Sequence, residues 1–413
     1  MKQEIITIRT KETAARIQAS EVAAVRVKDI TKKGVRVYRD GLIGVAGTVG
    51  DTTEDVLLEQ AAQNLQAGIK YPYPLTQNLR DHRCLNEAPM SSQELLEQAE
   101  SVLNTLRKDY PDFSFSESIA STEQIVQMRN SEGLDLEYRD AHFALMLMLK
   151  EKATANLFDG AVFCLTRSFD QEKFWSFNRP FLEAYRNKVE LPEGDVLPVF
   201  MWDHDVLLYF LARQLHGERF AKGSSLFSGK LGEQLFSEKV TIDVNRDPAL
   251  RPMTFFDTEG VVLPGNRLPV IENGRLAAVL TDKRTAETYG LAHTGAASGD
   301  YDDPPTIDGP LGSLLAFRAD SQNIAGVLQG RPAILALLCS GGDFTADGSF
   351  ATPVQVSFLF DGERIVGKLP EFAVRSHITK MLGEDYIGTF EDTNLYFGEL
   401  VRQVQGYYMT IVR

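Results

Sequence analysis

The amino-acid sequence predicts an α+β protein: an N-terminal α+β region followed by a C-terminal domain dominated by a large, mostly antiparallel β-sheet or barrel-like assembly. Three observations support this fold class. Stretches of period-two alternation are bounded by turn residues, few amphipathic helical runs interrupt them, and Asn-Gly or Asp-Gly pairs mark hairpin tips. Strands interrupted by few helices argue against a doubly wound parallel sheet. The 413 residues exceed one ordinary domain. We therefore divide the chain into residues 1–190, with sub-blocks 1–85 and 86–190, and residues 191–413.

The first sub-block begins with alternating polar and apolar side chains. Turns are expected at Lys33-Gly34 and Asp40-Gly41. Turns such as these would separate the short strands of an antiparallel meander, expected within residues 5–8, 22–27, 35–38 and 42–49. Acidic residues and an apolar run then predict a helix from about residue 51 to residue 68. The proline-containing stretch of residues 72–89 is predicted to be a linker.

The second sub-block opens with the capping-box pattern Ser91-x-x-Glu94, which predicts an amphipathic helix that runs to Leu106. Strands are expected at residues 113–129 and 134–149, and a helix at residues 171–189. Pro192 and Gly194 then mark the boundary of the C-terminal domain.

The C-terminal domain starts with a predicted strand, residues 196–201, and an apolar helix, residues 205–216. The helix face formed by Val206, Leu207, Phe210, Leu211 and Leu215 has the spacing of ordinary core. A glycine-punctuated loop follows. Two hairpins are expected farther on, with tips at Asn273-Gly274 and Asp361-Gly362.

Composition excludes several functional classes. Lys and Arg number 43 against 57 Asp and Glu, so the formal net charge is −14 and direct nucleic-acid binding is disfavoured. The longest apolar run is far shorter than the ~20 residues that span a bilayer, and the first residues lack a signal-peptide pattern. Three cysteines, Cys84, Cys164 and Cys339, are far apart and form no C-x-x-C pair. We expect a cytoplasmic protein with no membrane segment, in which the cysteines are small buried apolar residues.

An ordered series of motifs resembles the TldD/PmbA family, also called the modulator of DNA gyrase family. The series begins with Gly223-Ser224-Ser225-Leu226-Phe227-Ser228-Gly229-Lys230-Leu231-Gly232-Glu233, and its other members follow in the family's order: Asp257-Thr258-Glu259-Gly260, Ile271-Glu272-Asn273-Gly274 with Leu276, Thr285-Ala286, Thr294-Gly295, Gly341-Gly342 and Gly348. Near the front, residues 34–37 with Gly41 and Ala46, and residues 130–133, are similar to the family's N-terminal domain. The resemblance covers most of the chain. It implies an α+β N-terminal region and a C-terminal region built around a large sheet or barrel-like assembly.

The resemblance also locates a missing metal motif. In the peptidase branch of the family, a helix before the glycine-rich loop carries His-Glu-x-x-x-His, and a cysteine near the C-terminus completes a zinc site. Imidazole and thiolate hold the cation, and the carboxylate activates bound water. The equivalent positions of this chain are Leu208, Tyr209 and Arg213, and no cysteine follows Cys339. The departure implies the PmbA/TldE-like branch, with no cofactor in this chain and zinc only in a catalytic partner.

Other candidate sites are weaker. Asp203-His204-Asp205 with His216 suits a divalent ion in residue type, but a continuous helix would separate the two histidines by ~18 Å. Ser224 and Ser225 have no evident His-acid pair and no P-loop ending. The acidic, proline-rich segment Tyr301–Pro305 is an exposed loop, or a loop that rims a peptide groove. For that groove, the residues that we single out as candidates are Gly223, Ser224, Ser225, Gly341 and Gly342.

The leading hypothesis is a noncatalytic, PmbA/TldE-like subunit of a TldD-type metallopeptidase complex that acts on unfolded peptides. Its partner would be a paralogous TldD-like catalytic subunit, or a second copy of itself in a dimer. Two alternatives stay open: a stand-alone, self-associating peptide-binding protein with no protease activity, and an active metallopeptidase with an unrecognised metal site. A regulator that touches gyrase or nucleic acid rests mainly on the family's name, and the acidic balance counts against direct DNA contact.

Overall fold

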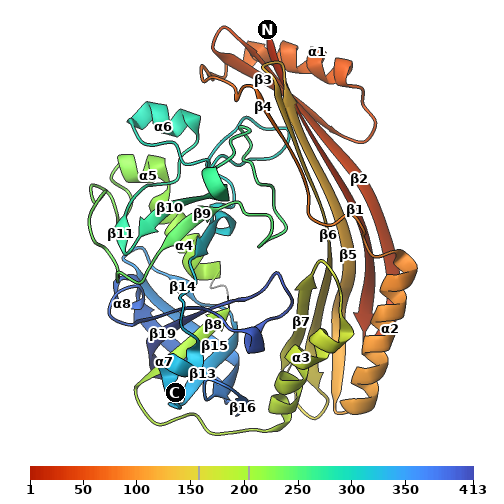
Figure 1. Ribbon diagram of the computed structural model, residues 1–413, viewed down its shortest axis with the longest axis vertical. Coiled ribbons are helices and arrows are strands. Elements are labelled where there is room, and N and C mark those ends of the chain that lie inside the picture. Colours follow the sequence, from red (N-terminus) through yellow and green to blue (C-terminus); the bar gives the residue numbers. More distant parts are fainter. Residues whose placement is uncertain (157–158, 203–204) are drawn as a thin grey trace.

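The computed structural model describes residues 1–156, 159–202 and 205–413, and in it a long curved sheet packs beside a separate C-terminal domain (Figure 1). The sheet belongs to the N-terminal region, coloured red to yellow in the figure. The C-terminal domain, green to blue, contains a barrel at one end and a small sheet with loops at the other. Strands with few helices between them confirm the predicted α+β class.

Seven strands form the N-terminal sheet in the order β3-β2-β1-β5-β6-β4, with β7 also paired to β6. Their bounds are β1 (Lys2–Gln18), β2 (Glu21–Arg39), β3 (Leu42–Val49), β4 (Leu79–Cys84), β5 (Phe113–Asn130), β6 (Leu134–Glu151) and β7 (Gly160–Thr166). Antiparallel hairpins join β1 to β2, β2 to β3, and β5 to β6. Side chains alternate between the two faces of such strands, which explains the period-two pattern of the sequence.

The turn predicted at Lys33-Gly34 is wrong, because β2 runs without interruption through these residues. The turn lies instead at Ala19 and Ser20, whose φ values are 50° and 65°. Glycine at position 34 has a steric explanation, because a Cβ atom there would lie 1.7 Å from the carbonyl oxygen of Tyr301. The glycine therefore allows a C-terminal loop to lie directly on the sheet.

Three helices pack against the N-terminal sheet, close to the predicted positions: α1 (Glu54–Asn64), α2 (Ser92–Asp109) and α3 (Gln171–Arg186). The capping box between Ser91 and Glu94 is present in full, and Asp170 caps α3 through two backbone N–H groups. Pro180 lies inside α3 without ending it. Helices α2 and α3 bury apolar residues in one core cluster that also includes barrel side chains, so this cluster joins the two parts of the molecule.

The stretch predicted to be a linker contains a strand. Within residues 72–89, β4 pairs in parallel with β6, from Leu79 beside Leu134 to Cys84 beside Arg139. The exposure of β4 residues alternates, but the six-residue strand is charged and lies between proline-rich segments. Local composition therefore concealed a strand whose partner is distant in the sequence.

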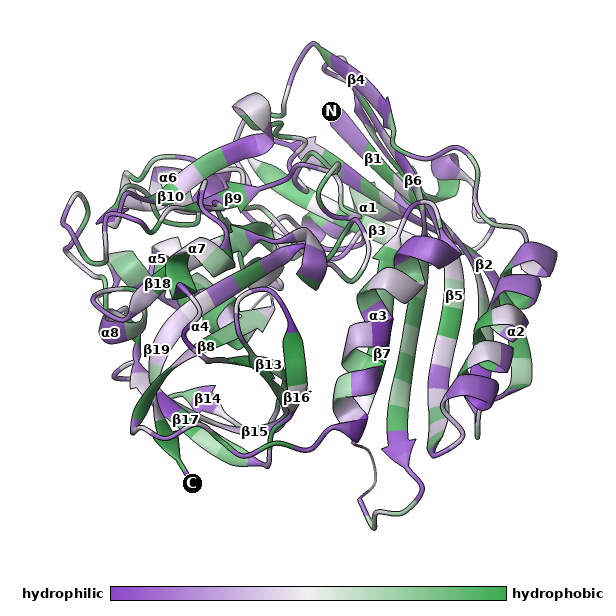
Figure 2. Ribbon diagram, turned by 60° about the horizontal axis from the view of Figure 1, so that its bottom comes forward, coloured by the Kyte–Doolittle hydropathy of each residue, from purple (hydrophilic) through white to green (hydrophobic). Residues whose placement is uncertain are grey.

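Five strands of the C-terminal domain close a barrel, because the order β13-β8-β19-β17-β15 returns to β13. The barrel strands are β8 (Val196–Trp202), β13 (Ala333–Cys339), β15 (Ser349–Phe360), β17 (Phe372–His377) and β19 (Gln403–Val412). Their pairings are antiparallel except for β13 with β8. Figure 2 shows these strands around the barrel, with α3 between the barrel and the N-terminal sheet. The barrel-like assembly that the resemblance implied is confirmed.

The rest of the C-terminal domain surrounds this barrel. Three strands extend its sheet: β14 (Asp343–Phe344), β16 (Ile365–Lys368) and β18 (Tyr386–Glu391). A second sheet has the order β11-β10-β9-β12, with bounds β9 (Ile242–Asn245), β10 (Arg267–Glu272), β11 (Arg275–Leu276) and β12 (Leu315–Phe317). The helices are α4 (Asp205–Leu215), α5 (Gly217–Ala221), α6 (Lys283–Tyr289), α7 (Ile324–Leu328) and α8 (Ile378–Met381). Both predicted hairpins form, β10 to β11 and β15 to β16.

The cysteines are all free, but only Cys164 is fully buried; Cys339 is half-buried and Cys84 is exposed. The prediction that each is a buried apolar residue is therefore wrong for Cys84. Among the described residues, no helix has both the length and the apolar character that crossing a membrane requires.

Candidate functional site

Helix α4 carries the positions where the resemblance places a zinc motif. Leu208 is buried in the C-terminal core, Tyr209 packs against Gly312 and keeps 47% of its surface exposed, and Arg213 is exposed. The apolar side chains Leu207, Phe210, Leu211 and Leu215 lie in the same core, as the helical spacing predicted. A leucine, a tyrosine and an arginine offer neither imidazole nor carboxylate. The described residues at these positions therefore do not fit the His-Glu-x-x-x-His chemistry.

The weaker candidates have structural explanations. His204 lies outside the described residues. His216 is the N-cap residue of the short helix α5, and its Nε2 atom lies 3.4 Å from a carboxylate oxygen of Asp308. The hydroxyl of Ser225 donates to the carbonyl of Gln214 at 2.5 Å, and that of Ser224 donates to the carbonyl of Arg219 at 3.2 Å. Both serines thus support the backbone of the glycine-punctuated loop that the sequence predicts after α4.

The other glycine candidates lie at a different place in the fold. Gly341 has φ of 85° in the connection between β13 and β14, and a Cβ atom at Gly342 would lie 2.3 Å from the carbonyl oxygen of Ala351. None of the five groove candidates, Gly223, Ser224, Ser225, Gly341 or Gly342, lines the cavity described below. A peptide contact at these positions stays a prediction.

A buried acidic centre forms where the Asp-x-Glu-Gly motif meets a histidine. The side chains of Asp257, Glu259 and His293 each place a ligand-type atom within 4.8 Å of the other two. The motif makes a tight turn in which one oxygen of Asp257 accepts from the backbone N–H groups of Glu259 and Val261, both at 2.9 Å. Gly260 at φ 68° permits this turn. We call this set of residues the Asp257–Glu259–His293 centre.

Glu259 ties the centre to the N-terminal region. Its carboxylate accepts a short hydrogen bond from the hydroxyl of Tyr71, a second from the backbone N–H of Lys283 at 3.0 Å, and lies 3.3 Å from Nε2 of His293. The hydroxyl of Thr76 also donates to the carbonyl of Glu259 at 2.8 Å. Tyr71 and Thr76 precede β4, and Lys283 opens α6. The buried carboxylate therefore fastens the N-terminal segment to the C-terminal domain.

The two carboxyl groups of the centre have opposite pKa shifts. Burial and the neighbouring charge of Glu259 raise the pKa of Asp257 to about 6. Burial alone would raise the pKa of Glu259, but the hydrogen bonds from His293 and Tyr71 and the charge of Lys283 hold it below its ordinary value. Burial and the Glu259 charge raise the pKa of Tyr71, so this phenol stays a donor. The environment therefore keeps the Glu259 charge and disfavours that of Asp257.

The residue types of the centre suit a divalent cation, but its oxygens already accept hydrogen bonds. Asp257 takes backbone N–H groups on both oxygens, including Ala297 at 3.3 Å, and Glu259 takes donors on both of its oxygens. A cation would have to displace several of these donors, each of which would then be buried without a partner. The contacts favour a structural junction over a metal centre.

A second buried pair holds a C-terminal loop against the sheet. Arg36 of β2 and Glu4 of β1 are each 1% exposed and lie 3.1 Å apart. The Arg36 guanidinium also donates to the carbonyls of Thr258, at 2.5 Å, and Asp303, at 3.1 Å. Burial lowers the pKa of Arg36, but the nearby Tyr38 and Glu4 outweigh this effect and the pKa is raised. We call this arrangement the Arg36 clamp.

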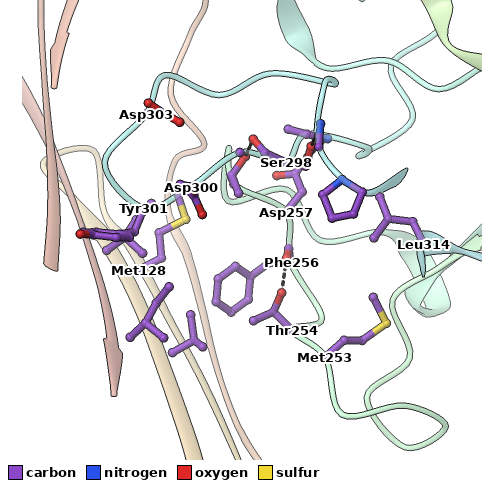
Figure 3. A pocket seen from close by; sticks show the side chains of 18 of the residues that line it. Met128, Met253, Thr254, Phe256, Asp257, Ser298, Asp300, Tyr301, Asp303 and Leu314 are labelled. Carbon is purple, nitrogen blue, oxygen red and sulfur yellow. Dashed lines mark hydrogen bonds between the residues drawn. The ribbon is translucent and has the colours of Figure 1, made fainter. Parts of the chain in front are cut away.

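A cavity of about 630 Å³ opens between the sheet and the C-terminal loops (Figure 3). Strands β1 and β5 supply one apolar wall, which is made of Ile6, Ile8, Val126 and Met128. The opposite wall comes from the C-terminal domain: Met253, Thr254, Phe256, Asp257, Ser298 and Leu314. Tyr301 and Asp303 line it as well, so the predicted groove-rimming loop does border a cavity. The clamp and the acidic centre hold the two walls in place.

Part of this site had a signal in the sequence. The Asp-x-Glu-Gly element was recognised as a motif, but nothing local to it indicated that Glu259 would contact Tyr71, 188 positions away. The sequence pattern does not indicate Arg36 or His293 as site residues. The sequence signal for Arg36 is its position between Val35 and Val37, in an otherwise apolar strand segment. A cation buried in such a segment requires a partner.

The fold defines a class of two-part α+β proteins, in which a long sheet packs on a C-terminal domain that contains a barrel. Residues 204–405 match the family model described as the PmbA/TldA metallopeptidase C-terminal domain. This chain therefore contains the C-terminal domain of the TldD/PmbA family. It is also 23% identical over 374 residues to an uncharacterized protein of Methanocaldococcus jannaschii. This alignment covers 88% of this chain and 86% of that protein.

Solved structures have the same fold over the whole chain. TldE from Thermococcus kodakarensis aligns with a TM-score of 0.79 at 18% identity, covering 100% of this chain and 97% of that one. A proposed modulator of a DNA gyrase from Thermotoga maritima aligns with a TM-score of 0.75 at 18% identity, covering 100% and 96%. A further proposed gyrase modulator, from Bacteroides thetaiotaomicron, gives 0.73 at 15% identity, covering 100% and 94%. At these identities the likeness establishes the fold.

Proposed function

We propose that this chain is a noncatalytic, TldE-like subunit of a TldD-type metallopeptidase complex that acts on unfolded peptides. The observation that carries the proposal is the set of side chains on α4. Leu208, Tyr209 and Arg213 stand where a catalytic member of the family would hold zinc and its general base. Leu208 belongs to the hydrophobic core, so restoring a ligand there would place a polar group in an apolar setting.

The physical role of such a subunit is to supply surface. The cavity between the sheet and the C-terminal loops offers apolar walls, and the clamp and the acidic centre fix their separation. A paralogous chain with an intact motif would supply the metal that polarises the scissile carbonyl. A dimer with that chain would place the two sets of groups in one assembly.

The proposal is tested by purifying this chain alone and together with a paralogue that carries His-Glu-x-x-x-His. We expect the chain alone to contain no stoichiometric zinc and to leave an unfolded peptide intact. The pair should hydrolyse the peptide in a chelator-sensitive way, and replacing the paralogue's motif glutamate by glutamine should abolish this activity. Chelator-sensitive hydrolysis by this chain alone would overturn the proposal. Failure of the two chains to associate would favour the stand-alone binding protein.

One observation favours a second function, an active metallopeptidase with an unrecognised metal site. The Asp257–Glu259–His293 centre has the ligand types for a divalent cation. If it were catalytic, Glu259→Gln would remove both bound metal and hydrolysis, while Glu287→Gln, an exposed substitution on α6, would leave both unchanged. We expect neither variant to alter metal content, since the oxygens of the centre already accept hydrogen bonds.

A further inference from the structure

The exposed charges around the interdomain cavity are of one sign. Two charged lining groups, Arg246 and Asp257, are buried and engaged: Arg246 donates to the carbonyls of Gly295, Phe256 and Ala297. The other charged lining residues are Asp300, Asp303 and Asp308, and all three are exposed. The accessible charge of the cavity is therefore negative.

Two of these carboxylates are available to a ligand. Asp308 lies 3.4 Å from His216 and accepts from the hydroxyl of Thr306, so it is already engaged. Among the described residues, no hydrogen bond or ion pair is found for the carboxylates of Asp300 or Asp303. Both stand on the loop that the Arg36 clamp holds through the backbone carbonyl of Asp303. Their side chains thus remain free while their backbone is fixed.

A lysine of β2 contacts an aromatic ring of the same loop. The Nζ atom of Lys32 lies 5.3 Å from the ring centroid of Tyr301, which follows Asp300 directly in the loop. Lys32 does not line the cavity. Among the described residues, no exposed cation lines the cavity beside Asp300 and Asp303, because Arg246 is buried.

The inner surface of the same cavity is mostly apolar. Ile6, Val126 and Met128 of the sheet pack with Phe256 in one hydrophobic cluster that lines the cavity, and Leu314 also lines it. Its volume of about 630 Å³ lies in the range of roughly 300–1,000 Å³ that is typical of ligand sites. Such a wall favours an apolar side chain, because burial removes that side chain from water.

We propose that this cavity binds an extended peptide segment in which a large apolar residue is flanked by basic residues. The proposal rests on the proposed peptide-handling function and names the class of peptide. The apolar side chain packs on the apolar residues that line the cavity, and the flanking cations lie by Asp300 and Asp303. Acidic segments are repelled by the same rim, and polar basic segments leave the apolar walls unfilled.

The test uses the full chain and three fluorescent nine-residue peptides on a common glycine-serine framework. The first carries a central phenylalanine flanked by lysines, the second a central phenylalanine flanked by glutamates, and the third a central serine flanked by lysines. We expect the first peptide to bind at least tenfold more tightly than the others by fluorescence anisotropy. Its affinity should fall as salt is raised, because the rim carboxylates are exposed.

Two variants, each with a matched control, localise the effect. Asp300→Asn with Asp303→Asn should weaken binding of the first peptide about fivefold at low salt, in the range expected for two exposed ion pairs. Glu363→Gln with Glu371→Gln makes the same change of net charge at exposed positions elsewhere and should have no effect. Ile8→Trp, which adds bulk to the cavity wall, should weaken binding at least tenfold, whereas Val27→Trp, on an exposed part of the same sheet, should not.

Each outcome decides the matter. Equal binding of the lysine and glutamate peptides, or an unchanged affinity in the Asp300→Asn/Asp303→Asn variant, would overturn the inference and leave the proposed function intact. If none of the three peptides bound, both the inference and the peptide-binding role of this chain would be refuted. The metal and partner measurements described above would still test the noncatalytic assignment independently.

Discussion

Arg36→Met should release the C-terminal loop from the N-terminal sheet. The guanidinium is buried against Glu4 and donates to the carbonyls of Thr258 and Asp303. Methionine keeps much of the apolar part of the arginine side chain. The Glu4 carboxylate is then left with one hydrogen-bond donor, the hydroxyl of Tyr38 at 3.0 Å. Removing one member of a buried ion pair typically costs about 3–5 kcal/mol. Because each 1.4 kcal/mol is a tenfold change in an equilibrium constant, the clamped state should lose about 100-fold or more in population relative to the open state.

Hydrogen exchange measures this loss locally, which avoids assigning one unfolding free energy to a chain of several parts. The backbone N–H groups of Ser298 and Thr306 donate across the loop, at 2.7 and 3.2 Å. In Arg36→Met, exchange of the fragment spanning residues 297–307 should accelerate about 100-fold, while residues 349–360 of the barrel should exchange as before. Arg39→Met, at an arginine 59% exposed in the same strand, is the matched control and should change neither fragment.

A double-mutant cycle identifies the ion pair as the cause. Glu4→Gln combined with Arg36→Met removes both charges, so the cycle should give a coupling of about 1–3 kcal/mol. An acceleration of less than fivefold in Arg36→Met, or additive effects in the double variant, would refute the clamp.

Three further predictions concern the junction between the two parts. Gly34→Ala should also accelerate exchange of the 297–307 fragment, since its Cβ would lie 1.7 Å from the Tyr301 carbonyl oxygen; unchanged exchange would contradict this. Tyr71→Phe removes the donor to the charged Glu259 and should destabilise the junction by about 1.5–3 kcal/mol, measured by exchange of the 71–78 segment. Asp257→Asn should alter the pH dependence of stability. The raised pKa of Asp257 means that the folded wild type still holds a proton at a pH where the unfolded chain has lost it. The stability of the wild type relative to the variant should therefore fall from pH 4 to pH 7, by up to about 3 kcal/mol. A thermal-unfolding difference that did not change with pH would contradict the last of these.

The sequence predicted elements whose signals are local. Three features appear where expected: the Ser91 capping box, the hairpin tip at Asn273-Gly274 and the apolar face of α4. Each depends on residues that are close in the sequence. The barrel was expected from family resemblance, and its closure through β13 and β15 is confirmed.

Features created by distant contacts were missed. Gly34 resembles a turn glycine in isolation, and only the approach of Tyr301 explains why it lies in mid-strand. Likewise, β4 forms because β6 offers a free edge, which no local pattern reveals. The acidic centre required Tyr71, Glu259 and His293 to meet from three separate segments. Long-range pairing overrides local propensity in each case.

The noncatalytic assignment is tested most directly by the zinc stoichiometry of the native complex, measured by intact-complex mass spectrometry on material isolated from its own cells. We expect an assembly of this chain with a motif-bearing paralogue in which every zinc ion is retained by the paralogue after dissociation. A zinc ion that remains bound to this polypeptide after separation would contradict the assignment.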